Sequence, residues 1–167
     1  MEIKDIYNVF ETVANAYVDI NDISYSKAWD LNGQPSATYP KVLIECQPDY
    51  TTINARGETG SEYLPIKKKY QIKVFLFDRW SLSEQKVTSA SYLTLAEKQS
   101  AMQLIFERYL AEVQRYLIEE HKGCYIEGIE SNGFFGFFNK TNDGLVEIFE
   151  KVTVVASSQC IKGVFNY

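Results

Sequence analysis

The stretch from Leu93 to Lys122 constrains the fold most, because its apolar residues recur at intervals of three and four. That spacing places them along one broad stripe of an α-helix. The stripe consists of Met102, Ile105, Phe106, Tyr109, Leu110, Val113, Tyr116 and Leu117. The opposite face carries Glu107, Arg108, Glu112, Gln114, Arg115 and Glu119. The pattern predicts a helix of about 40 Å, whose stripe needs a packing partner of similar length.

Residues near both ends of this stretch predict where the helix begins and ends. Thr94 is followed three residues later by Glu97, which matches a capping box and predicts a helix start at Thr94. Gly123 stands where a helix commonly ends in a left-handed residue. His121, the only histidine, is expected to complement the negative end of the helix dipole and not to act as a catalytic base.

Two strand-like runs follow the helix and predict a hairpin. The first alternates from Cys124 to Glu130, and glycine in the segment 131–133 predicts a bulge or bend before it continues. Thr141-Asn142-Asp143-Gly144 is a hairpin turn signal. The second run, 145–156, alternates most cleanly: its apolar side carries Val146, Ile148, Val152 and Val154, with Glu150 as an interruption.

The residues before the long helix predict one more helix and three strands. Apolar residues at helical spacing predict an amphipathic helix from Ile3 to Val18. Segments 23–29 and 39–47 read as strands, the first weakly. In 70–78 both sides become apolar toward Phe77, which predicts a central strand covered on both faces at that end.

These elements predict a single α+β domain over residues 1–167. Its order is α-β-β-β-α-β-β, with a mostly antiparallel sheet packed against the long helix and an additional N-terminal helix. The polar segment 47–65 is expected to be a long loop into which short strands extend from both ends. The segment 157–167 is expected to be a tail, and it is unusually apolar for a terminus.

Loop and tail are the predicted contacts with other protein subunits. Lys67, Lys68 and Lys69 read either as a solvated strand edge that discourages pairing or as a contact with an acidic partner. The candidate subunit-interface residues are Tyr50, Ile53, Arg56, Glu58, Tyr63, Lys67, Lys68, Lys69, Glu150, Ile161, Val164, Phe165 and Tyr167.

Composition narrows the function classes. Aromatic residues make up 14% of the chain, with 12 Tyr and 10 Phe, which suits a packed sheet and also protein interfaces. The net charge of −5 argues against general nucleic-acid binding. No run is long and apolar enough for a membrane span, and the N-terminus lacks signal-peptide features. We therefore expect a protein that is made and assembled in the cytosol and does not bind membranes.

No cluster of chemistry-bearing residues points to a reaction. Cys46, Cys124 and Cys160 are too far apart for a zinc pattern or a disulfide framework, and the first two are expected to be buried thiols. Neither a phosphate-binding glycine loop nor a nucleophile elbow occurs. We expect a non-enzymatic protein with no cofactor and no metal.

Two segments stand out within this layout. They are VFLFD at 74–78 and FNKTNDGLVEIFEKVTVVASSQC at 138–160, where an Asn-Asp turn precedes a final strand and a closing Cys. With these segments, the layout resembles the tail-terminator and tail-completion (neck ring) proteins of tailed bacteriophages, most of all those of Bacteroides-infecting and crAss-like phages. It covers about the last two-thirds of the chain. Glu150 departs from simple core packing and is a candidate inter-subunit contact.

The resemblance implies a structural virion subunit that is assembled in the host cytoplasm and closes into a ring of six or twelve copies. The partners it implies are copies of the chain and neighbouring neck, tail or portal proteins. DNA would be only a passing cargo, which an acidic lumen would repel weakly. The loop 47–65 would project toward neighbours or the lumen.

Two other functions stay open. One is a small ligand-binding protein or enzyme of hot-dog or cystatin-like layout, which acts as a dimer. It would need a buried acid with a raised pKa, such as Asp78 or Glu150. The other is an assembly chaperone that does not stay in the particle.

Overall fold

The computed structural model describes residues 3–25, 38–45, 49–54, 66–80, 89–121, 124–135 and 144–157. The chain is a single α+β domain, whose described residues form two helices and one mostly antiparallel sheet, and this confirms the predicted class. The elements are α1 (Ile3–Ala16), β1 (Asp22–Tyr25), β2 (Lys41–Ile44), β3 (Asp49–Asn54), β4 (Ile66–Trp80), α2 (Ser89–Glu120), β5 (Cys124–Phe135) and β6 (Gly144–Ser157).

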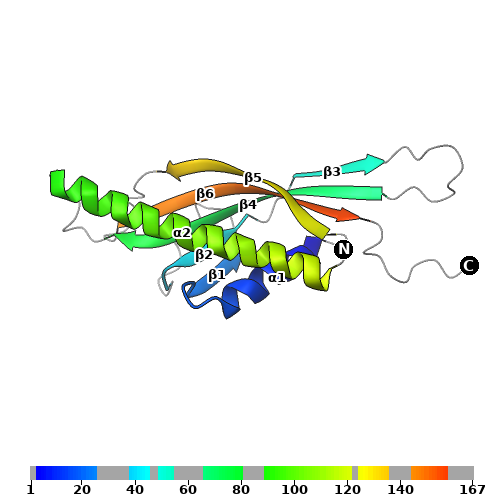
Figure 1. Cartoon of the computed structure of the whole chain (residues 1–167), viewed down its shortest axis with the longest axis horizontal. Helices are drawn as coiled ribbons and strands as arrows, with labels where there is room; N and C mark the ends of the chain where they lie inside the picture. The colour runs from blue at the N-terminus through cyan, green and yellow to red at the C-terminus, as the bar shows by residue number, and fades with distance from the viewer. Residues whose placement is uncertain are drawn as a thin grey trace, which may run out of the picture.

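The sheet is built around two long antiparallel strands, β4 and β6, which pair continuously from Lys67↔Ser157 to Trp80↔Gly144. Its order is β1-β2-β4-β6-β5, and β3 also pairs with β4, on the edge that β4 shares with β2 (Figure 1). Among the described strands, β1 and β2 are the one pair that runs parallel. The segment predicted to be a central strand is therefore central, as part of β4.

Both helices cover one face of the sheet. Helix α2 has 32 residues, so it is roughly 48 Å long. It runs along the sheet, and α1 lies beside its C-terminal half (Figure 1). The predicted stripe faces this core: Met102, Phe106, Tyr109, Leu110, Val113 and Leu117 are buried, and Ile105 and Tyr116 pack partly buried against them. Val146, Ile148, Val152 and Val154 of β6 face the same core, as predicted.

A buried hydrogen bond joins the two helices. The Tyr109 hydroxyl donates to the Phe10 carbonyl at 2.9 Å, and the two rings meet edge to face at 6.3 Å. Burial, and next the charge interaction with Tyr25, raises the pKa of Tyr109 well above its ordinary value. The Tyr25 hydroxyl in turn donates to the Tyr7 carbonyl at 3.0 Å. These contacts connect α1, α2 and β1 at one place.

The opposite face of the sheet has a smaller apolar cluster. Leu43, Phe75 and Phe77 are buried there, with Tyr39 and Phe149 packed against them. The Phe75 and Phe149 rings stack at 4.7 Å. Because β2 contributes to both clusters, all four of its residues are buried, and Lys41 forms an ion pair with Asp22 at 2.9 Å.

Helix α2 begins at Ser89, so the predicted start at Thr94 was wrong. Thr94 and Glu97 lie inside the helix. A cap contributes only about 1 kcal/mol, and the five residues before Thr94 include neither Gly nor Pro, so nothing local stops the helix from extending past it.

The segment 47–65 contains a strand, β3, which pairs antiparallel with the start of β4. As a result, Lys67, Lys68 and Lys69 lie between β3 and β6, and their prediction as a sheet edge was wrong. The expected bulge appears as a register shift between Ser131 and Phe134, and a second shift follows Ile126. Residues 55–65, the turn 141–143 and the tail from 158 lie outside the described residues.

Candidate functional site: a groove between α2 and β5

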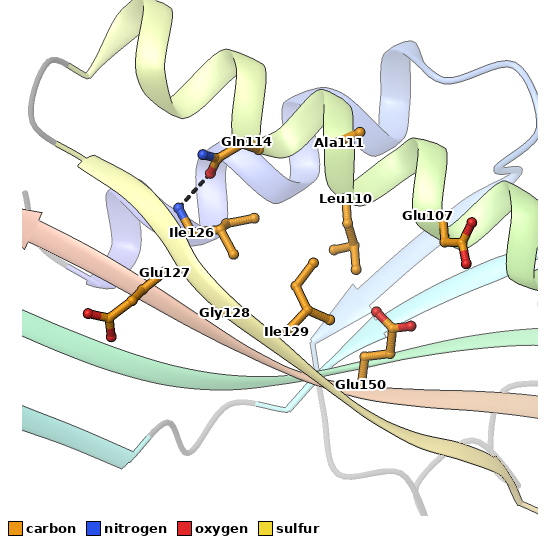
Figure 2. A pocket seen from close by; sticks show the side chains of 9 residues that line it. All are labelled: Glu107, Leu110, Ala111, Gln114, Ile126, Glu127, Gly128, Ile129 and Glu150. Atoms are coloured by element: carbon orange, nitrogen blue, oxygen red, sulfur yellow. Dashed lines mark hydrogen bonds between the residues drawn. The ribbon is translucent and has the colours of Figure 1, made fainter.

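A groove of about 530 Å³ lies between α2 and the edge strand β5, with β6 contributing at one end (Figure 2). This volume is in the range of small-ligand sites. Its lining residues are Glu107, Leu110, Ala111 and Gln114 from α2, Ile126, Glu127, Gly128 and Ile129 from β5, and Glu150 from β6.

Small residues and the bulge in β5 explain why the helix and the strand do not close on each other here. Ala111 and Gly128 face the groove from the two sides, and a Cβ added at Gly128 would meet no atom within 4 Å. At one end the Gln114 side chain holds the strand, because its Oε1 accepts a hydrogen bond from the Ile126 backbone N–H at 2.5 Å (Figure 2). This hydrogen bond therefore holds β5 to α2 at the Gln114 end of the groove, and the groove is open toward Ile129.

A buried carboxyl group stands at the other end of the groove. Glu150 lies opposite Val74 in the sheet, on the helix-covered face, and its residue is only 6% exposed. Its Oε2 has no hydrogen-bond partner among the described residues. Burial, and next the nearby charge of Glu107, raises the pKa of Glu150. An unpaired buried carboxyl is costly, so its presence calls for a physical explanation.

Glu107 supplies a second carboxyl group at the same end. Its side chain and that of Glu150 lie close to one another across the gap between α2 and β6 (Figure 2). Glu107 is exposed, and Gln103 Nε2 donates to its Oε1 at 2.8 Å. The third acid, Glu127, turns away from the groove and pairs with Lys69 on β4.

The walls between these ends are apolar. Leu110 is 1% exposed and belongs to the main core, whereas Ile129 is 46% exposed and forms the outer wall. Ile126 completes the wall near Gln114 (Figure 2). The arrangement thus combines an apolar channel with two carboxyl groups at one end.

Of the predicted interface residues, Glu150 alone among those with described side chains lines this groove. Lys69 is engaged by Glu127, and Lys68 is half-buried. The backbones of Tyr50 and Ile53 pair with β4, but their side chains lie outside the described part, as does that of Lys67. Arg56, Glu58, Tyr63, Ile161, Val164, Phe165 and Tyr167 also lie outside the described residues.

Asp78, the other acid proposed for a ligand-binding function, is held in an ion pair. Its Oδ2 lies 2.5 Å from Lys98 Nζ on α2, and its Oδ1 accepts the Arg79 backbone N–H at 2.7 Å. Its side chain does not line the groove.

Sequence reasoning missed Glu107, Gln114 and Ile129 as parts of one site. Glu107 and Gln114 were assigned to the outer face of the helix, and they lie at the flank of the stripe beside Leu110. The available signal was the apolar Ile129 next to a glycine in the strand predicted at 124–130. Nothing in the sequence placed it across from α2.

A second buried carboxyl group, Glu147, lies on the opposite face of β6. It is 4% exposed, pairs across the sheet with Phe77, and its Oε2 has no hydrogen-bond partner among the described residues. Burial raises its pKa from 4.5 to about 7. Cys124 is buried and in no disulfide, as predicted.

Within the described ranges, no group of three or more His, Cys, Asp and Glu side chains is placed to hold a metal ion. Neither described helix is long and apolar enough to cross a membrane. No protein-family model matches the sequence, and no curated protein matches it at a significant level.

Proposed function

We propose that the chain is a structural subunit that associates side by side with copies of itself into a closed ring, in the role of a phage tail-terminator or tail-completion protein. The phage role rests on the resemblance of 74–78 and 138–160. The self-association rests on one structural observation, an exposed apolar line beside a sheet edge.

That line consists of Leu104, Ala111 and Ile118, which recur every seven residues at exposed positions of α2, with Ala111 also lining the groove. Leu104 is 47% exposed and Ile118 is 54% exposed. Ile129 on the neighbouring strand β5 is 46% exposed. Among the described strands, β5 has a strand partner on one side only, so it is an edge strand of the kind to which another chain can pair.

The surroundings of this line fit a protein interface. Arg115 pairs with Glu112 at 2.8 Å and with Glu119 at 2.7 Å, so charged groups border the apolar residues. An apolar centre with a polar rim is the usual anatomy of a protein contact. A surface that binds a different surface on the next copy closes into a ring when the rotation permits.

The test is the mass of the purified full chain in solution, measured by native mass spectrometry across a concentration series. We expect a closed species of six or twelve copies. The double variant Leu104→Lys/Ile118→Lys should shift it to monomer, because burying two ammonium groups in an apolar contact is unfavourable. Val18→Lys is the matched control, since Val18 is 92% exposed on the turn after α1.

A tight dimer with no larger species would contradict the ring. It would favour the second candidate, a dimeric ligand-binding protein or enzyme, which has its own supporting observation. That observation is the buried carboxyl group of Glu150 at the end of an apolar groove. A buried acid with a raised pKa in a pocket is a common feature of binding and catalytic sites.

A further inference from the structure

The carboxyl group of Glu150 is the strongest indication of a ligand. Only 6% of the residue is exposed, and its Oε2 has no hydrogen-bond partner among the described residues. Figure 2 shows the side chain rising from β6 toward α2, at the end of the groove. Buried charges in proteins are normally paired, so this site lacks its complementary group.

The charge of the site selects the sign of that group. Glu107 and Glu150 lie at the same end, and the charge of Glu107 acts on Glu150. Two neighbouring carboxylates repel an anion and favour a cation placed between them. Gln114 Oε1, at the other end of the groove, is occupied by the Ile126 N–H.

The shape of the groove selects the kind of cation. Among the described residues no group of three or more metal-ligating side chains gathers here, so a bare divalent ion would need water for most of its six or more oxygen ligands. The walls next to the carboxylates are Leu110 and Ile129, and Ile126 continues them toward Gln114, so the groove suits a hydrocarbon stem. A ligand with an apolar stem and a cationic head would match both parts of the site.

We infer that the groove between α2 and β5 binds an aliphatic cation, an ammonium or guanidinium group carried on a short hydrocarbon stem. The head lies between Glu150 and Glu107, and the stem lies along Leu110 and Ile129. A guanidinium fits best, because its planar donors can bond both carboxylates at once. A free small amine and the Lys or Arg side chain of a second copy of the chain share this chemistry. The inference needs only the groove of one chain and does not rest on ring formation.

The probe is n-butylguanidinium, and its neutral match is n-butylurea, which has almost the same shape. Binding to the full chain is followed at pH 8 by saturation-transfer NMR, which can be applied both to the monomer and to larger assemblies. The titrations use protein concentrations below those at which copies associate. We expect saturation transfer to the butyl protons of the guanidinium, with an affinity at least about ten-fold above that of the urea.

Glu150→Gln keeps the shape of the side chain and removes its charge, and it should weaken the guanidinium at least about ten-fold. Glu107→Gln should weaken it less, because that carboxyl group is exposed to solvent. Ala111→Leu should block the stem without changing any charge. Glu97→Gln, at an exposed position of α2 outside the groove, is the control and should leave binding unchanged.

Equal binding of the urea and the guanidinium would overturn the inference, as would binding that Glu150→Gln does not change. Circular dichroism of each variant verifies that it is folded, and Ala111→Leu tests the groove independently of Glu150.

Native mass spectrometry with saturating butylguanidinium distinguishes the two sources of the cation, a side chain of another copy and a free amine. Dissociation of larger species indicates a side chain from another copy, and unchanged masses indicate a free amine. Binding of the probe by a chain that stays monomeric would support the groove and contradict the ring.

Discussion

Each face of the sheet buries one glutamate of β6, and the surroundings of the two carboxyl groups differ. Glu150 projects from the helix-covered face, where an open groove reaches it and Glu107 stands beside it. Glu147 projects from the opposite face, across from Phe77 and next to the small aromatic cluster. Both carboxyl groups are nearly inaccessible, and burial raises the pKa of both.

The difference shows that burial of an acid does not by itself make a binding site. Glu150 is next to space that a ligand can enter, so its lost hydration can be replaced by a cation. Glu147 lines no described groove, so its burial acts on stability and on its dependence on pH. A raised pKa marks both residues, and only the geometry separates their roles.

The largest change in the free energy of unfolding is expected when one aromatic side chain on each face of the sheet is truncated. Phe106 is 0% exposed in the large cluster, and Phe75 is 8% exposed in the small one. We expect Phe106→Ala to lower the free energy of unfolding by about 4 kcal/mol and Phe75→Ala by about 3 kcal/mol, measured by denaturant titration. A larger loss for Phe75→Ala would mean that the opposite face carries more of the stability than its described contacts indicate.

The next largest effect is expected for Glu147→Gln, whose change in the free energy of unfolding should depend on pH. The pKa in the folded protein, about 7, lies above the ordinary value of 4.5, so the folded state binds the proton more tightly. Stability therefore falls as the pH rises from about 4.5 to about 7. The variant should raise the free energy of unfolding by about 2 kcal/mol at pH 8 and have almost no effect at pH 4.

Thermal or urea unfolding at both pH values measures this effect. Glu97→Gln, an exposed carboxyl group on α2, is the control and should change stability little at either pH. An equal effect of Glu147→Gln at pH 4 and pH 8 would rule out its protonation as the cause.

A smaller loss of stability is expected when the hydrogen bond at the Gln114 end of the groove is removed. Gln114→Ala removes the side chain that accepts the Ile126 backbone N–H, and it should cost about 1 kcal/mol. Hydrogen exchange of the Ile126 amide should accelerate more than that of Val152, which lies inside the sheet on β6. Unchanged protection at Ile126 would show that the strand does not depend on this bond.

The smallest effect is expected for Glu150→Gln without ligand. Its pKa is raised by burial and by Glu107, so the variant should stabilise the protein at pH 8 more than at pH 4. The gain should be the smallest of the series, because Glu150 lines a groove whereas Glu147 lines none that the structure describes. A gain larger than that of Glu147→Gln in the same urea series would reverse the comparison of the two faces.

The helix stripe and the final strand were predictable because their signals are local and periodic. Met102 to Leu117 repeat at the helical interval, and the alternation in 145–156 assigns side chains to two faces. The start of α2 was not predictable in this way, because the capping signal at Thr94 is weaker than helix propagation through it. The place of Lys67–Lys69 inside the sheet depends on pairing with β3 and β6.

The sequence by itself determined that Glu147 and Glu150 would lie on opposite sides of one strand, because side chains alternate along an extended backbone. Only the tertiary structure decided that both are buried, that Glu107 meets Glu150, and that a groove opens beside one of them. Those facts depend on how α2 passes over β5 and β6, since burial and the space between elements arise from residues far apart in the chain.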